Sequence, residues 1–230
     1  MRKPSSKAFW NAAASENAAW YIATKFSSET DEFFASGARE VDHFLSQGGV
    51  AIGATDHLLE IGSGVGRMTR RFAQLAGRVT ASDVSGEMLA RARTNLAGVD
   101  NVDLLELSGE GDLPLPDDSV DAVFSYITMQ HVPTAAAQER YFAEAIRVTR
   151  PGGWVYMQFR RPGLRLRVLD WVGHITHLTR GRRTLNRAWR GARVSERSLA
   201  TAGASAGRLE FRSSGRHLWA LARVDGAPSR

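Results

Sequence analysis

The sequence contains no cysteine, so neither a disulfide framework nor a thiolate nucleophile is available to the protein. No apolar run approaches the roughly 20 residues that a membrane-spanning helix needs. The basic residues at the start are not followed by the apolar stretch of a secretory signal peptide. These features lead us to expect a cytoplasmic protein.

Acidic residues are also comparatively few, because 30 Lys and Arg stand against 24 Asp and Glu, a net charge of +6. The imbalance is local: residues 160–197 hold eleven arginines, opposed only by Asp170 and Glu196. Apolar side chains are interspersed among them, which predicts one or two basic amphipathic helices. Such helices are suited to cover an active site, to bind an anionic substrate or to contact a membrane surface. They are less suited to bind a nucleic acid. A solvated face without any partner is the simplest alternative.

The rest of the 230 residues alternates between short apolar runs and longer amphipathic segments. We expect strands at 57–61, 78–83, 101–107, 121–127 and 152–159, helices at 65–76, 85–97 and 134–149, and a closing strand pair at 207–212 and 216–224. This alternation predicts an α/β fold with a doubly wound, mostly parallel sheet and helices on both faces. We expect a helical N-terminal cap (1–50), a core (51–160), the basic helical insert (161–194), and a C-terminal helix and strand pair (195–230) that completes the same domain.

The most informative segment is Leu58-Leu59-Glu60-Ile61-Gly62-Ser63-Gly64-Val65-Gly66-Arg67. It reads as a buried strand with an acidic residue near its end, followed by three alternate glycines and a helix. Glycines let the backbone approach a ligand closely, and a helix start offers free N–H groups to an anion. The spacing departs from the dinucleotide pattern, because Arg67 occupies its third glycine position. Glu60 would repel a pyrophosphate but attract an ammonium group, so a ligand carrying both an amine and a carboxylate fits better; a tight turn without a ligand is the alternative.

A second acidic residue, Asp83, ends the next strand, 23 residues after Glu60. In doubly wound sheets an acid at about this distance accepts hydrogen bonds from ribose hydroxyls. Ser85 then fits the N-cap of a helix whose Met88 faces the sheet. An ordinary solvated turn is the weaker interpretation of Asp83.

Taken in order, these motifs resemble those of the class I S-adenosylmethionine-dependent methyltransferases. LLEIGSGVGR is similar to their first motif and VTASDVSGEML to their second, while residues 112–121 and 147–153 resemble the segments before the fourth and fifth strands. The resemblance implies S-adenosylmethionine as the cofactor, a seven-stranded sheet with an antiparallel last strand, and a cofactor site at the carboxyl ends of the strands. It implies that Gly62 and Gly64 border the methionine part, that Asp83 holds the ribose, and that Val84 or Met88 lines the adenine.

The family often has an acid for the adenine amine after the third strand, where this sequence has Ser108-Gly109-Glu110. Either Glu110 replaces that acid or backbone groups contact the adenine. Tyr21 is a candidate for closing the pocket, although an aromatic residue in an apolar helix is more often part of a core. The full set of expected cofactor-binding residues is Tyr21, Glu60, Gly62, Ser63, Gly64, Arg67, Asp83, Val84, Met88, Gly109, Glu110, Gly111, Ser125 and Tyr126.

For the methyl acceptor, the segment after the fourth strand offers His131, whose ordinary pKa suits a general base. A purely structural hydrogen-bonding role for His131 is the stronger alternative, since the resemblance implies that a histidine at this place often has that role. Gln130, Tyr156 and Gln158 are expected on the acceptor side, and we expect no metal. The segment lacks the Asn/Asp-Pro-Pro-Tyr motif associated with amino-group methylation.

The sequence therefore predicts a methyltransferase acting on a hydroxyl of a sugar, glycolipid or secondary metabolite. An RNA methyltransferase that uses the arginine-rich segment is the main alternative. A cofactor-binding regulatory protein without catalytic activity is a further one.

Overall fold

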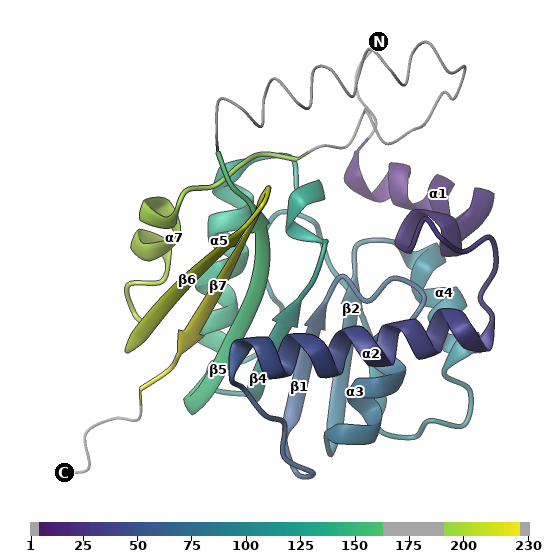
Figure 1. The fold of residues 1–230 in the computed structure, drawn as a ribbon, viewed down its shortest axis with the longest axis horizontal. Coiled ribbons are helices and arrows are strands. Elements are labelled where there is room, and N and C mark those ends of the chain that lie inside the picture. Colours follow the sequence, from purple (N-terminus) through teal and green to yellow (C-terminus); the bar gives the residue numbers. More distant parts are fainter. Residues whose placement is uncertain (1–4, 163–190, 226–230) are drawn as a thin grey trace.

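The computed structural model describes residues 5–162 and 191–225, which form one seven-stranded sheet with helices on both faces (Figure 1). The strands follow the order β3-β2-β1-β4-β5-β7-β6. They are β1 His57–Ile61, β2 Arg78–Asp83, β3 Val102–Glu106, β4 Val120–Ser125, β5 Thr149–Arg160, β6 Arg208–Ser214 and β7 His217–Arg223. The helices are α1 Ser6–Ile22, α2 Asp31–Gly48, α3 Thr69–Leu75, α4 Gly86–Asn95, the 3₁₀ helix η1 Met129–His131, α5 Ala135–Val148 and α7 Glu196–Ala202. The expected α/β fold is confirmed.

Strands β1 to β5 are parallel, and β7 runs antiparallel to both of its neighbours, β5 and β6. The strand order reverses between β1 and β4, which pair directly. In open α/β sheets a ligand binds beyond the carboxyl ends of the strands at such a reversal. The ends of β1, β2 and β4 therefore define where a site should lie.

Both faces of the sheet are covered. On one face, Phe44 of α2 and Phe72 of α3 pack around Phe124 of β4. On the other face, Phe142 of α5 and Phe159 of β5 belong to a second apolar cluster that also includes α7. In Figure 1, α2 crosses in front of the sheet while α5 and α7 lie behind and beside β5. Because the central strands are buried on both sides, they read as apolar runs rather than alternating ones.

Helix α1 lies over the start of α4, beyond the carboxyl end of the sheet (Figure 1). Asn11 links the two helices, because its Oδ1 accepts a hydrogen bond of 2.7 Å from the Ser85 hydroxyl. Asn17 has non-helical backbone angles and interrupts α1, and its Oδ1 then accepts from the Trp20 N–H at 3.0 Å. The interruption lets α1 bend over the end of the sheet and bring side chains toward it.

The start of α3 differs from the sequence-based expectation. Helix α3 begins at Thr69 rather than at residue 65, because Gly66 has a φ of +85° and residues 64–68 form turns. The loop after β1 is therefore longer than expected. Most of the expected basic insert (163–190) lies outside the described residues, and in the part that is described no helix is both long and apolar enough to cross a bilayer.

Candidate cofactor and acceptor site

The loop after β1 bends sharply at Gly62, whose φ is +85°. A Cβ atom on Gly62 would lie 1.9 Å from Thr128 Oγ1, so no side chain fits there. The Gly62 N–H donates to the Ser82 carbonyl at 2.7 Å, which ties the loop to the end of β2. Glycine is needed at this position for both the left-handed backbone and the close approach to the segment after β4.

Asp83 lies at the end of β2 and holds the same loop. Its Oδ2 accepts from the Gly64 N–H and its Oδ1 from the Ser85 N–H, both at 2.9 Å. Burial raises the pKa of the Asp83 carboxyl, and the backbone donors of Ser85, Gly64 and Val84 act in the opposite direction. The carboxyl lines the cavity and is fixed in place before any ligand binds.

Glu60, near the end of β1, is only 4% exposed and also lines the cavity. Burial raises the pKa of Glu60 to about 7, although the Thr69 hydroxyl donates to its Oε2 and Arg67 lies nearby. A buried carboxyl without a full counter-charge favours a cationic ligand, because an adjacent positive charge stabilises its ionised form.

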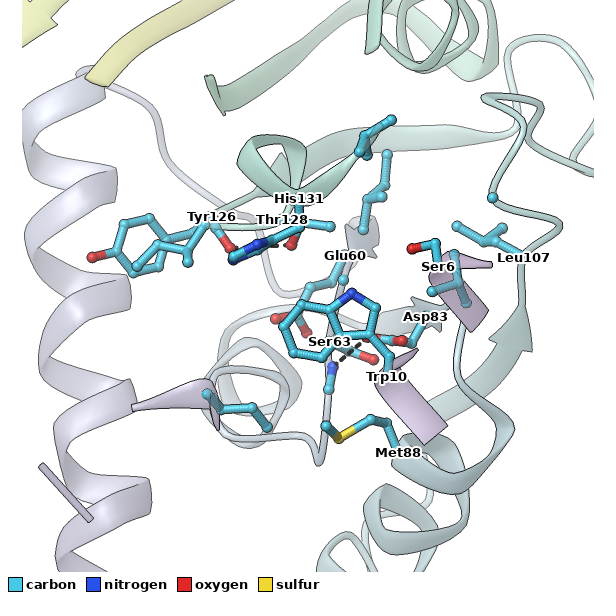
Figure 2. Close-up of a pocket in the computed structure, with 18 of the residues that line it drawn as sticks. Ser6, Trp10, Glu60, Ser63, Asp83, Met88, Leu107, Tyr126, Thr128 and His131 are labelled. Carbon is cyan, nitrogen blue, oxygen red and sulfur yellow. Dashed lines mark hydrogen bonds between the residues drawn. The ribbon is translucent and has the colours of Figure 1, made fainter. Parts of the chain in front are cut away.

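The cavity has an empty volume of about 1020 Å³, space open to solvent included. Figure 2 shows it between the glycine loop, Asp83 and Met88 on one side and Thr128 and His131 on the other. The structure brings many of the sequence-predicted residues to its lining: Tyr21, Glu60, Gly62, Ser63, Gly64, Arg67, Asp83, Val84, Met88, Gly109, Tyr126 and His131.

Three predicted cofactor residues do not line the cavity. Ser125 is buried in the sheet, where its hydroxyl donates to the Ile61 carbonyl at 2.9 Å. Glu110 is exposed to solvent. Gly111 packs against α5, since a Cβ there would lie 2.7 Å from the Ala137 carbonyl oxygen. Of the segment Ser108-Gly109-Glu110, only Gly109 lines the cavity, so the structure gives no support to Glu110 as the acid expected near the adenine.

Tyr156 and Gln158 of β5 are not on the acceptor side either. The Tyr156 ring is buried beside α2 and stacks on Trp219, with ring centroids 4.4 Å apart. Gln158 is 5% exposed and pairs in register with Trp219 of β7. Side chains two apart on a strand share a face, so both residues point into the layer under α2 rather than toward the strand ends.

Tyr21 reaches the cavity from α1, but its hydroxyl donates to Glu16 Oε2 at 2.8 Å. Burial and Glu16 together raise the pKa of Tyr21 to about 12. In this arrangement the ring, rather than the hydroxyl, forms the wall of the cavity.

Arg67 is buried and joins the glycine loop to α2. Its guanidinium donates to Glu40 Oε2 at 2.6 Å and to the Ser36 hydroxyl at 3.1 Å. Arg67 Nε and the Ser63 hydroxyl are two of the buried side-chain atoms that have no hydrogen-bond partner among the described residues. Buried polar groups normally have hydrogen-bond partners, so a ligand with acceptor atoms would supply a partner for each of these two donors.

The lining suits S-adenosylmethionine. Glu60 offers a negative charge for the ammonium group, and Ser63 offers a free polar atom near the loop for the carboxylate. Asp83 offers acceptor oxygens for the ribose, while Val84 and Met88 provide apolar surface for the adenine.

Several lining residues were not predicted from the sequence. The Trp10 indole reaches into the cavity in front of Ser63 (Figure 2) and meets the His131 ring edge-on, with centroids 5.1 Å apart. Ile127 adopts a φ of +58°, which is rare for a β-branched residue. Thr128 fills the space beside Gly62, and Tyr141 lines the cavity from α5. None of these residues belongs to a recognisable motif, and the packing that places them is tertiary.

A second hollow adjoins the cavity, and the two share seven lining residues: Trp10, Tyr21, Ile22, Arg67, Tyr126, Ile127 and His131. Its remaining walls come mainly from the end of α1, the following turn and α2. They include the rings of Phe9, Trp20 and Phe26, the predicted Gln130, and the charged groups of Lys25, Glu32, Arg39 and Glu40. The hollow is thus apolar where aromatic rings line it and charged at other points.

His131 lies where the two hollows meet, and Gln130 Nε2 lies 3.2 Å from its Nε2. Because an amide nitrogen only donates, this contact is a hydrogen bond in the tautomer that leaves His131 Nε2 unprotonated.

Comparison with known proteins supports this interpretation of the fold and the cavity. Residues 59–157 match the family model described as a methyltransferase domain. Demethylmenaquinone methyltransferase from Tropheryma whipplei is 32% identical over 114 residues, which cover 49% of this chain and 46% of that protein. Malonyl-[acyl-carrier protein] O-methyltransferase from Yersinia pestis is 32% identical over 171 residues, which cover 72% of this chain and 58% of that protein. The matches thus span about half the length of these relatives.

Among solved structures, magnesium protoporphyrin IX methyltransferase (ChlM) from Synechocystis PCC 6803 with bound SAH has a TM-score of 0.62. It is 17% identical, and the match covers 94% of this chain and 97% of that chain. Such a likeness shows a shared fold. Together with the family match over the strands that build the cavity, it shows that residues 59–157 form a methyltransferase domain with the fold of the S-adenosylmethionine-dependent enzymes.

Proposed function

We propose that the protein transfers the methyl group of S-adenosylmethionine to a small-molecule acceptor bound in the second hollow. The proposal rests on the residues that line both hollows, which show that the two hollows adjoin. The hollow that offers Glu60 and Asp83 to a cofactor opens, past Trp10 and His131, into a second hollow lined with aromatic rings. An acceptor there can face the cofactor without either ligand displacing the other.

The acceptor that best fits is a ring compound with a hydroxyl group, such as a secondary metabolite. Phe9, Trp10 and Trp20 offer flat apolar surfaces to a ring, and the charged residues offer contacts to polar substituents. This lining favours a metabolite over the free sugar that the sequence alone left equally open. Demethylmenaquinone and malonyl-[acyl-carrier protein] methyltransferases, the relatives in sequence, are likewise named for substrates that are not nucleic acids.

The bound cofactor supplies an electrophilic methyl group on a positively charged sulfur. The residues of this chain then have two tasks: to hold the acceptor oxygen in line with that methyl group and to take its proton. We propose His131 for the second task, because it lies on the border of both hollows and an imidazole is a suitable general base near neutral pH.

The test is transfer of a labelled methyl group from S-adenosylmethionine to a panel of phenolic and aliphatic hydroxyl compounds, with identification of the product. We expect a methyl ether, and we expect Asp83→Ala to lower transfer by roughly 3- to 80-fold at cofactor concentrations near the wild-type KM. A wild-type protein that binds the cofactor but methylates no acceptor, in the panel or in cell extract, would support a regulatory role instead.

Methylation at carbon is a second candidate, favoured by the relative named demethylmenaquinone methyltransferase. The aromatic walls would suit an electron-rich ring equally well, and His131 would then take the proton released from the ring carbon. Product analysis separates the two, since the new methyl group is attached to oxygen in one case and to carbon in the other.

An RNA acceptor remains the alternative suggested by the arginines of residues 160–197, most of which lie outside the described residues. Binding through many phosphates weakens steeply with salt, whereas binding of a neutral ring compound does not. Turnover of RNA that falls steeply between low and moderate salt would favour this alternative.

A further inference from the structure

The segment after β4 that carries His131 is held from outside by a distant part of the chain. The Gly191 N–H donates to the Gln130 carbonyl at 2.8 Å, and the Ala192 N–H donates to the Val132 carbonyl at 3.1 Å. Two residues further on, the Val194 N–H donates to the carbonyl of Arg160 at the end of β5. Residues 191–194 therefore lie along the backbone on both sides of His131, from Gln130 to Val132.

Gly191 allows this contact because no side chain would fit. A Cβ atom at residue 191 would lie 2.1 Å from the Val132 carbonyl oxygen and 2.8 Å from the Val132 N and C atoms. All three are backbone atoms, which cannot turn away as a flexible side chain can. A larger residue would have to separate the two segments.

Gln138 of α5 joins the same two segments through its side chain. It is fully buried, and its Nε2 donates to the Val132 carbonyl at 3.0 Å and to the Ala192 carbonyl at 3.1 Å. The amide group has two hydrogens, so it can make both bonds at once. Val132 O accepts from Gln138 and from Ala192, which uses both of its lone pairs.

From these contacts we infer that Gln138 and Gly191 are positioning residues for His131. This inference rests on the proposed function. Neither residue lines the cavity or the second hollow. Both hold the backbone at Gln130 and Val132, and that backbone determines where the His131 ring meets the acceptor.

The contacts of Gln138 and Gly191 should affect turnover more than cofactor binding. In-line transfer depends on alignment, and a displacement of about 1 Å can lower a rate on the order of 100-fold. The groups offered to the cofactor, Glu60 and Asp83, are held by separate contacts with Thr69, Gly64 and Ser85. Loosening the His131 segment should therefore lower kcat much more than cofactor affinity.

The first experiment compares Gln138→Met, which removes both donated bonds at similar side-chain length, with Gln74→Met as a control on α3. Gln74 contacts Arg71 on the surface and is remote from His131 in the fold. We expect kcat to fall about 10-fold or more in Gln138→Met, with the dissociation constant of S-adenosylhomocysteine within about twofold of wild type. The control should behave as wild type.

A third variant separates positioning from general loss of structure. Gln138→Glu places a carboxyl group beside two carbonyl oxygens, and this group donates a hydrogen bond only when it is protonated. The rate of this variant relative to wild type should therefore rise as the pH falls, while the relative rate of Gln138→Met should not. Because ionisation of a buried carboxyl also lowers stability, circular dichroism is recorded at each pH. A difference in rate at constant folded fraction then reports positioning.

Gly191→Ala tests the other half of the inference, with Gly53→Ala as its control. A Cβ at residue 53 would meet only the side chain of Asp56, at 3.0 Å, and residue 53 precedes β1 far from the acceptor hollow. We expect Gly191→Ala to reproduce the defect of Gln138→Met and Gly53→Ala to leave turnover unchanged.

Amide hydrogen exchange gives a readout that needs no turnover. In folded Gln138→Met, exchange should rise in peptides covering 128–133 and 191–194 and stay unchanged in those covering 58–64. If the wild-type protein proves inactive but this rise is found, the proposed function fails and the contact between the segments stands. Folded variants that match wild type in both exchange and kcat would overturn the inference.

Discussion

The buried carboxyl of Glu60 gives a prediction that can be worked out quantitatively. Burial raises the pKa of Glu60 to about 7. If the ammonium group of the cofactor binds beside it, the pKa should return toward its ordinary value of 4.5. Binding should then release about half a proton near pH 7 and about 0.9 of a proton near pH 6. By the same linkage, affinity should be about eightfold higher near pH 7.5 than near pH 6.

The assay is titration calorimetry with S-adenosylhomocysteine, which keeps the amine and carboxylate but transfers no methyl group. Repeating it in buffers of different ionisation enthalpy gives the number of protons released. Glu60→Gln should remove this release and flatten the pH dependence. Asp83→Asn separates the contribution of the second carboxyl, whose pKa burial also raises. If Glu60→Gln releases as many protons as wild type, Glu60 does not meet the ammonium group and the reasoning is wrong.

Three further predictions concern the same site. Asp83→Ala should weaken cofactor binding by about 1–3 kcal/mol because ribose hydroxyls lose their acceptor; unchanged affinity in calorimetry would remove Asp83 from the site. His131→Ala should slow turnover on the order of 100-fold with cofactor affinity nearly intact, whereas a fully active variant would assign His131 a structural role. Gly62→Ala should lose cofactor binding while remaining folded, since its Cβ would lie 1.9 Å from Thr128 Oγ1 and force the loop away from its position; thermal shift and circular dichroism together check both statements.

The sheet and the side of it that binds the cofactor could be predicted from local signals. Glu60 lies near the end of one short apolar run and Asp83 ends the next. Parallel strands place the carboxyl ends of both runs at the same edge of the sheet. Ser85 caps α4 as expected, with its hydroxyl accepting from the Met88 N–H at 3.1 Å. Gly49 ends α2 in the left-handed conformation typical of a helix C-terminus. These features depend on neighbouring residues and are therefore visible in the sequence.

The errors on β5 have a different cause. Tyr156 and Gln158 were expected to face the acceptor, but both faces of β5 are buried, so its residues from Trp154 onward show no alternation of apolar and polar side chains. Without that alternation the sequence does not show which face a side chain occupies. The positions of Trp10 and Thr128 were not predicted for a related reason, since they depend on how α1 and the segment after β4 fold over the glycine loop.

The central claim is that residues 58–88 receive S-adenosylmethionine with its sulfur toward His131 and the second hollow. A crystal structure with S-adenosylhomocysteine tests it most directly. We predict the ribose hydroxyls on the Asp83 carboxyl, the amine beside Glu60, and the sulfur facing the hollow lined by Trp10 and His131. A nucleoside bound elsewhere, or no bound nucleoside at saturating concentration, would contradict the claim.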